Sequence, residues 1–163
     1  MKKVLSVLLS CACAMALCGC GASPAAAVAQ GEAFQAGGEG YMLNEIMRVP
    51  DYDTEDELGY GVEILMKSNS APVRFSSGNS VQSLVGLTLD DGDGGTYTYT
   101  EVSFALNEDG SDYQGSALFI FCLPEAAAFP ETGTFIYTGG SEEEKVTLSF
   151  KDMEVSGAEV SSG

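Results

Sequence analysis

Short runs of alternating apolar and polar residues dominate the chain after its first forty residues, and they predict β-strands. In residues 60–67 the side chains of Val62, Ile64 and Met66 fall on one face of an extended chain. The stretch 117–123 is apolar throughout, which is typical of a strand at the centre of a sheet. The other predicted strands are residues 81–89, 96–106, 134–138 and 145–150.

The same alternation predicts which side chains of these strands share a face. Residues 134–138 and 145–150 are predicted to form a hairpin, with Val146, Leu148 and Phe150 pointing inward. Residues 41–49 suit either a strand or one short helix. The remaining apolar positions that share a face are Val81, Val85, Leu87 and Leu89 in one strand, and Val102, Phe104 and Leu106 in another.

Six or seven short strands without a long helix predict an all-β fold. Gly-Asp clusters at residues 90–95 and 107–110 supply turns between the strands. About 115 residues suit one domain with one core. We therefore expect an antiparallel β-sandwich of about seven strands over residues 41–155.

The N-terminus has the pattern of an export signal. Lys2 and Lys3 precede an apolar run, Val4 to Leu17, which is too short to span a bilayer as a helix. The sequence Leu17-Cys18-Gly19-Cys20 then resembles the lipobox of bacterial lipoproteins. The resemblance implies that residues 1–19 are a lipoprotein signal peptide and that Cys20 becomes an acylated N-terminus. The alternative is a plain secretory signal, cleaved near Ala22 or Ala27.

Lipidation would place the protein on the extracytoplasmic side of the cell membrane, as a tethered domain that does not span it. Two or more acyl chains hold a protein stably at a membrane, whereas a single chain holds it only marginally. Residues 20–40 contain mainly Gly and Ala and are predicted to form a flexible linker after the acylated Cys20. Residues 156–163 are predicted to be a disordered tail.

The charge of the chain excludes one class of partner. The formal net charge is −17, and removal of residues 1–19 leaves five basic residues against 24 acidic ones, a net charge of −19. Such a surface repels phosphate groups, so nucleic-acid binding is excluded.

The chain has no His, which removes the usual base of serine-hydrolase triads and a frequent zinc ligand. We therefore expect no enzyme activity.

Cys122 would be the single thiol left after Cys20 is acylated, so no intramolecular disulfide is expected. Because Cys122 lies within the apolar stretch 117–123, we interpret it as a buried small hydrophobe. A reactive thiol is the alternative.

Two stretches carry a family resemblance. The segment 86–99 contains Leu89, Asp91, Gly94 and Tyr97, and the segment 115–137 contains Gly115, Phe119 and Pro124. These stretches resemble the strand motifs of the immunoglobulin-like, telokin-like domain that follows a linker in many Gram-positive lipoproteins of unknown function. The resemblance implies an immunoglobulin-like β-sandwich at the cell surface, and it brings no catalytic residues.

The turn at residues 90–95 is the candidate metal site. Asp90, Asp91 and Asp93 could supply carboxylate oxygens to calcium, which prefers six to eight oxygen ligands. Gly92 and Gly94, however, occupy positions where a calcium loop needs side-chain oxygens. The alternative is a hairpin turn, in which Asp-Gly and Gly-Gly pairs provide the positive φ values. We favour the turn.

Two main functions remain open, and no cofactor is expected apart from calcium in the second. The first is a membrane-anchored, non-catalytic module that binds an envelope protein or a small ligand. The second is a structural or accessory lipoprotein whose acidic turns bind calcium; the acidic run 51–59 is a further place for a cation or a basic partner. A small hydrolase is a third, remote alternative, because paired carboxylates alone can hydrolyse glycosides.

The lipid anchor predicts the behaviour of the variant Cys20→Ala. We expect this variant to accumulate unprocessed or to be released, and to incorporate no labelled fatty acid, because the acylated thiol is missing. Membrane fractionation with labelled palmitate measures both effects. A mature-sized variant that partitions fully to membranes would contradict the lipoprotein interpretation.

Overall fold

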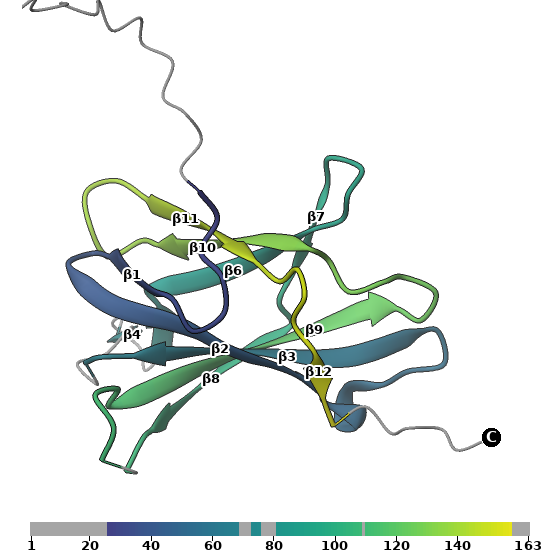
Figure 1. Cartoon of the computed structure of the whole chain (residues 1–163), viewed down its shortest axis with the longest axis horizontal. Coiled ribbons are helices and arrows are strands. Elements are labelled where there is room, and N and C mark those ends of the chain that lie inside the picture. Colours follow the sequence, from purple (N-terminus) through teal and green to yellow (C-terminus); the bar gives the residue numbers. More distant parts are fainter. Residues whose placement is uncertain (1–25, 69–72, 76–80, 109, 158–163) are drawn as a thin grey trace, which may run out of the picture.

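The chain folds as an all-β protein in which two antiparallel sheets pack face to face (Figure 1). The computed structural model describes residues 26–68, 73–75, 81–108 and 110–157. The helix in the described part of the chain is one short 3-10 turn, and it lacks the length and apolar character needed to cross a membrane. The elements are β1 (Ala33–Ala36), β2 (Glu39–Arg48), η1 (Pro50–Tyr52), β3 (Glu57–Met66), β4 (Val73–Phe75), β5 (Val81–Ser83), β6 (Val85–Asp90), β7 (Thr96–Thr98), β8 (Glu101–Leu106), β9 (Gly115–Pro124), β10 (Thr132–Tyr137), β11 (Glu144–Ser149) and β12 (Val155–Ser156).

The larger sheet has the strand order β1-β2-β3-β9-β8, and β12 adds to β2 in parallel. The predicted central strand is confirmed, because β9 pairs with β3 on one side and with β8 on the other. The smaller sheet has the order β11-β10-β6-β7 and contains the predicted hairpin, β10 with β11. The short strands β4 and β5 form a separate pair.

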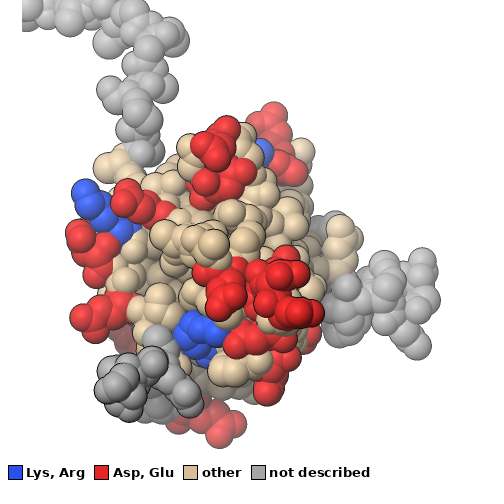
Figure 2. Space-filling model, turned by 90° about the vertical axis from the view of Figure 1, so that its right-hand side faces the viewer, with Lys and Arg blue, Asp and Glu red and all other residues tan. Residues whose placement is uncertain are grey.

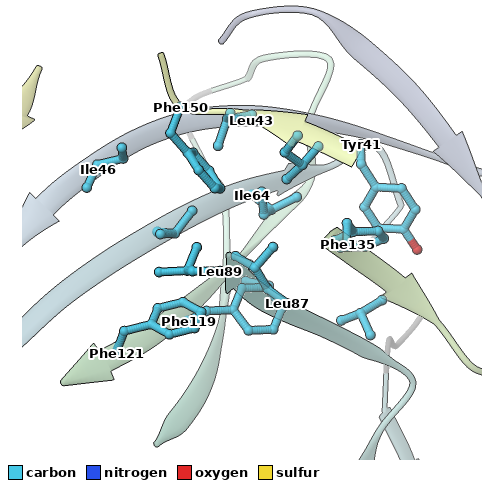
Figure 3. Close-up of a cluster of buried hydrophobic side chains, with 14 of the residues drawn as sticks. Tyr41, Leu43, Ile46, Ile64, Leu87, Leu89, Phe119, Phe121, Phe135 and Phe150 are labelled. Atoms are coloured by element: carbon cyan, nitrogen blue, oxygen red, sulfur yellow. The ribbon is translucent and has the colours of Figure 1, made fainter. Parts of the chain in front are cut away.

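The core lies between the two sheets and follows the alternation of the strands (Figure 3). Leu87 and Leu89 of β6 face Phe119 and Phe121 of β9, and all four side chains are fully buried. The predicted inward positions Leu148 and Phe150 are buried, as are Val62, Ile64 and Met66. An aromatic cluster closes one side of the core, with ring centroids 4.8–5.5 Å apart; its members are Phe34, Tyr41 and Phe135.

Two stretches predicted as single strands are each divided in two. The stretch 81–89 breaks at Leu84, where the Ser83 hydroxyl donates to the Val85 carbonyl. The stretch 96–106 breaks after Thr98, so that β7 joins the smaller sheet and β8 joins the larger one. Tyr99 fills this crossing, with its ring 5.2 Å from that of Phe119. The alternation of apolar and polar residues over 96–106 did not reveal that this segment passes from one sheet to the other.

The sandwich begins earlier in the chain than the sequence predicted. Residues 33–40 were expected in the flexible linker, yet they form β1 and the start of β2, and Phe34 and Ala36 are buried. Val28 forms a parallel bridge with Leu148, which covers the edge of β11 with backbone hydrogen bonds. Phe34 and Val28 thus pack in or against the core, although the Gly- and Ala-rich composition around them predicts a flexible linker. Residues 1–25 and 158–163, including Cys20, lie outside the described residues.

The outer face of the larger sheet carries a second small apolar cluster. A Cβ atom on Gly61 would lie 2.9 Å from Leu118 Cδ1, and one on Gly59 would lie 2.7 Å from the Tyr52 Cβ atom. Gly59 therefore leaves the space into which Tyr52 of η1 packs, and Gly61 leaves the space that Leu118 fills. The Tyr52 hydroxyl donates to the carboxylate of Glu101, and this hydrogen bond raises the pKa of Tyr52.

Cys122 belongs to this outer face, so its assignment to the buried core is wrong. It follows the alternation of β9 away from the core, and its half-buried side chain lies beneath η1. The Cys122 Sγ atom lies 3.6 Å from the Thr100 hydroxyl and 3.8 Å from the Tyr52 carbonyl oxygen. The apolar sequence around Cys122 masked the alternation, because Leu118 and Ile120 also point outward.

Truncation of a core phenyl group tests this packing. We expect Phe121→Ala to lower the free energy of unfolding by about 3–5 kcal/mol, because the buried ring leaves a cavity between the sheets. The control Leu106→Ala should cost less than about 0.5 kcal/mol, since that side chain on the edge strand β8 is 67% exposed. Denaturant unfolding followed by circular dichroism measures both. Equal effects of the two substitutions, or a helix content near one third, would contradict the fold.

Candidate functional site

The candidate metal turn forms the hairpin connection between β6 and β7. Oδ1 of Asp91 accepts hydrogen bonds from the backbone amides of Asp93 at 2.9 Å and Gly95 at 2.8 Å. Gly92 and Gly94 have φ values of 84° and 89°, a region that glycine adopts without strain. Asp91 thus closes a hairpin turn between β6 and β7 with its own carboxylate.

The three candidate aspartates have different surroundings. Asp90 is the last residue of β6, and its Oδ2 accepts a 2.6 Å hydrogen bond from the Thr132 hydroxyl of β10. Asp91 and Asp93 are exposed, and the Asp93 amide is held by Asp91. Within the described residues, no three Asp, Glu or Cys side chains gather in a way that could hold a metal ion.

Beside this turn lies a groove of about 500 Å³. One wall is the β6–β7 turn with Asp90 and Asp91, and the other is the segment between β9 and β10, which contributes Phe129 and Glu131. Tyr97 of β7 lines the groove as well. Pairing of β10 with β6 creates it, because Gly133 lies opposite Leu89 and sets Thr132 beside Asp90.

The groove combines aromatic surface with carboxylates. Phe129 is half-buried, and its ring is held at 5.2 Å from that of Tyr60 and 5.7 Å from that of Phe150. Tyr97 is also half-buried and packs against the core. None of the described residues that line the groove is Lys or Arg. The groove therefore offers a negative, partly apolar surface.

This groove is part of an acidic end of the sandwich, formed by three connections: residues 50–57, 90–95 and 124–132. Together they contain ten Asp and Glu residues and no Lys or Arg. The Glu125 amide donates to the Asp56 carbonyl at 2.9 Å, which joins two of the connections. Figure 2 shows acidic side chains gathered over this end of the molecule, with few basic ones among them.

Arg48 borders the acidic end, and its charge is engaged by the protein itself. Its guanidinium lies 2.8 Å from Asp53 Oδ2 and 4.9 Å from the centre of the Tyr60 ring. The Gly59 amide donates to Asp53 at 2.7 Å. This backbone hydrogen bond, together with Arg48, lowers the pKa of Asp53 although partial desolvation opposes the shift. Within the acidic run 51–59, Asp53 therefore has a structural role, whereas Asp51, Glu55 and Asp56 are exposed to solvent.

The sequence pointed to only part of this site. Asp90 and Asp91 were candidates, but as calcium ligands, and Asp93 lies outside the groove. Phe129, Glu131 and Thr132 were not singled out, because only the pairing of β6 with β10 brings them to the aspartates. The sole sequence signal was their position next to a predicted strand.

The engaged Asp91 carboxylate leads to a prediction for calcium. We expect millimolar calcium and magnesium at equal ionic strength to raise the melting temperature alike, since Gly92 and Gly94 add no side-chain oxygens. Thermal unfolding in the two salts measures this. A calcium-specific rise of several degrees that is lost in Asp91→Asn combined with Asp93→Asn would contradict it.

Comparisons with known proteins complete the description of the site. No family model, no curated protein and no solved structure matches the chain. Its function is therefore inferred from the chemistry and geometry of its own residues.

Proposed function

We propose that the protein is a lipid-anchored, non-catalytic binding module on the extracytoplasmic face of the cell membrane, and that its acidic end contacts a cationic partner. The anchor is inferred from the lipobox-like Leu17-Cys18-Gly19-Cys20. The observation that carries the binding function is the acidic end itself, where three connections gather ten carboxylates and contain no Lys or Arg of their own, although Arg48 and Lys151 lie beside them.

The fold is proposed to be immunoglobulin-like, related to the telokin-like domains of Gram-positive lipoproteins. The two antiparallel sheets support this proposal, as do the buried motif residues Leu89 and Phe119 in the facing sheets. A rigid sandwich suits a binding module, because its connections gather at its ends and can present side chains without disturbing the core.

Charge complementarity gives the acidic end its role in recognition. Opposite charges on two surfaces speed association and orient the partners, whereas like charges exclude the wrong ones. Apart from Arg48 with Asp53 and Lys145 with Glu143, the described residues form no ion pairs, so most carboxylates of the acidic end are not neutralised by the protein.

Crosslinking in membranes tests the proposal. We expect the wild-type protein to form a discrete adduct that weakens as salt is raised, because screening reduces the attraction between charged surfaces. The combined substitution Asp51→Asn, Glu55→Gln and Asp56→Asn should greatly reduce the adduct, since all three side chains are exposed at the acidic end.

The matched control removes three charges elsewhere. Glu108→Gln, Asp112→Asn and Glu142→Gln alter exposed residues outside the three connections, and the adduct should persist in this variant. Loss of the adduct in both triple variants would show an effect of net charge alone. That result, or the absence of any salt-sensitive adduct, would contradict binding at the acidic end.

A further inference from the structure

The groove beside the β6–β7 turn has the dimensions of a small-molecule site. Its volume of about 500 Å³ lies within the roughly 300–1,000 Å³ typical of such pockets. Ala127 and Ala128 in one wall and Gly92 in the other are small, so they leave the space between the walls open. The aromatic rings of Tyr97 and Phe129 supply the apolar part of the surface.

Two of the three carboxylates of the groove, Asp90 and Asp91, are held in place by hydrogen bonds. Asp90 accepts a hydrogen bond from the Thr132 hydroxyl, and Oδ1 of Asp91 accepts hydrogen bonds from two backbone amides. A Cβ atom on Gly95 would lie 2.2 Å from Asp91 Oδ2, so glycine at this position is what lets the carboxylate fold against the turn. Neither Asp90, Asp91 nor Glu131 forms an ion pair among the described residues. The Asp90 and Asp91 carboxylates are therefore positioned, and none of the three carboxylates has an ion-pair partner among the described residues.

The arrangement fits an organic cation better than a metal ion. A metal ion needs several oxygens that converge on one point, and the described residues contain no such group. Asp90 and Asp91 line the groove from the β6–β7 turn and Glu131 lines it from the segment before β10, while Tyr97 and Phe129 add aromatic surface to the lining. Ammonium groups pair with carboxylates and also lie favourably over aromatic rings, while methylene groups cover apolar surface.

We propose that this groove binds a small linear polyamine, with one ammonium group at the Asp90 and Asp91 wall and another at Glu131. The methylene segment between the two ammonium groups lies against Tyr97 and Phe129. This proposal rests on the binding function proposed above and names the class of ligand that one part of the acidic end accepts.

Calorimetric titration of the mature full-length protein in a non-ionic detergent, with spermidine as the probe, tests the proposal. Asp91→Asn keeps a carbonyl oxygen that can accept the turn amides and removes the charge, and Glu131→Gln does the same for the other wall. Each should weaken spermidine binding roughly tenfold or more, because a charge-assisted hydrogen bond is lost. Butylamine, which has one ammonium group, should bind at least about tenfold more weakly than spermidine for the same reason.

Two matched substitutions separate a site from a general charge effect. Asp93→Asn lies in the same turn as Asp91, and Glu125→Gln lies in the same connection as Glu131, yet neither residue lines the groove. Both controls should leave the affinity within about twofold. Three outcomes would overturn the polyamine site. They are equal weakening in all four variants, binding of magnesium as strong as that of spermidine at equal ionic strength, and no measurable spermidine binding. If the polyamine site fails but the salt-sensitive crosslinked adduct is still observed, the proposed binding function of the acidic end remains supported.

Discussion

The pairing of β9 with β3 is the interaction on which the rest of the structure depends. Ten consecutive residue pairs, from Glu57 with Pro124 to Met66 with Gly115, join the two strands without a register shift. One face of this pair presents Phe119 and Phe121 to the smaller sheet, where they meet the leucines of β6. A shift by one residue would turn these rings to solvent and remove the core.

The same pairing decides where the charges gather. Since Glu57 lies opposite Pro124, the connections before β3 and after β9 emerge side by side, and the Glu125 amide bonds to the Asp56 carbonyl. Pairing of β6 with β10 then adds the β6–β7 turn to the same end. The acidic end is thus a consequence of strand register, although its residues are distant in the sequence.

Carboxylates gathered in this way repel one another, and the structure offsets part of the cost locally. Backbone amides bind Asp91 in its turn and Asp53 near β3, and Arg48 adds a cation to the second. Most of the remaining carboxylates of the acidic end are exposed, where water and salt screen them. The Asp90, Asp91 and Glu131 group differs because it borders aromatic surface, so an ammonium ligand there would relieve repulsion and cover apolar area together.

The amino-acid sequence by itself determined most of the strands of the two sheets, the buried face of strands such as β3 and β6, and the turn at residues 90–95. These features follow from local rules: a period of two for strands, and glycine with aspartate for tight turns. Leu87, Leu89, Leu148 and Phe150 are buried as the alternation indicated. The proposed anchor at Cys20, and the net charge of −19 that removal of residues 1–19 would leave, are likewise inferences from the sequence alone.

Apart from the hairpins β6–β7 and β10–β11, only the tertiary structure decided which strands meet. The crossing at Tyr99, the burial of Phe34 in a Gly- and Ala-rich stretch, and the outward position of Cys122 all depend on partners far along the chain. The groove is the clearest case, because Asp90 and Glu131 become neighbours through the pairing of β6 with β10. Local periodicity reports which face of a strand is apolar, but it carries no information about the strand that lies opposite.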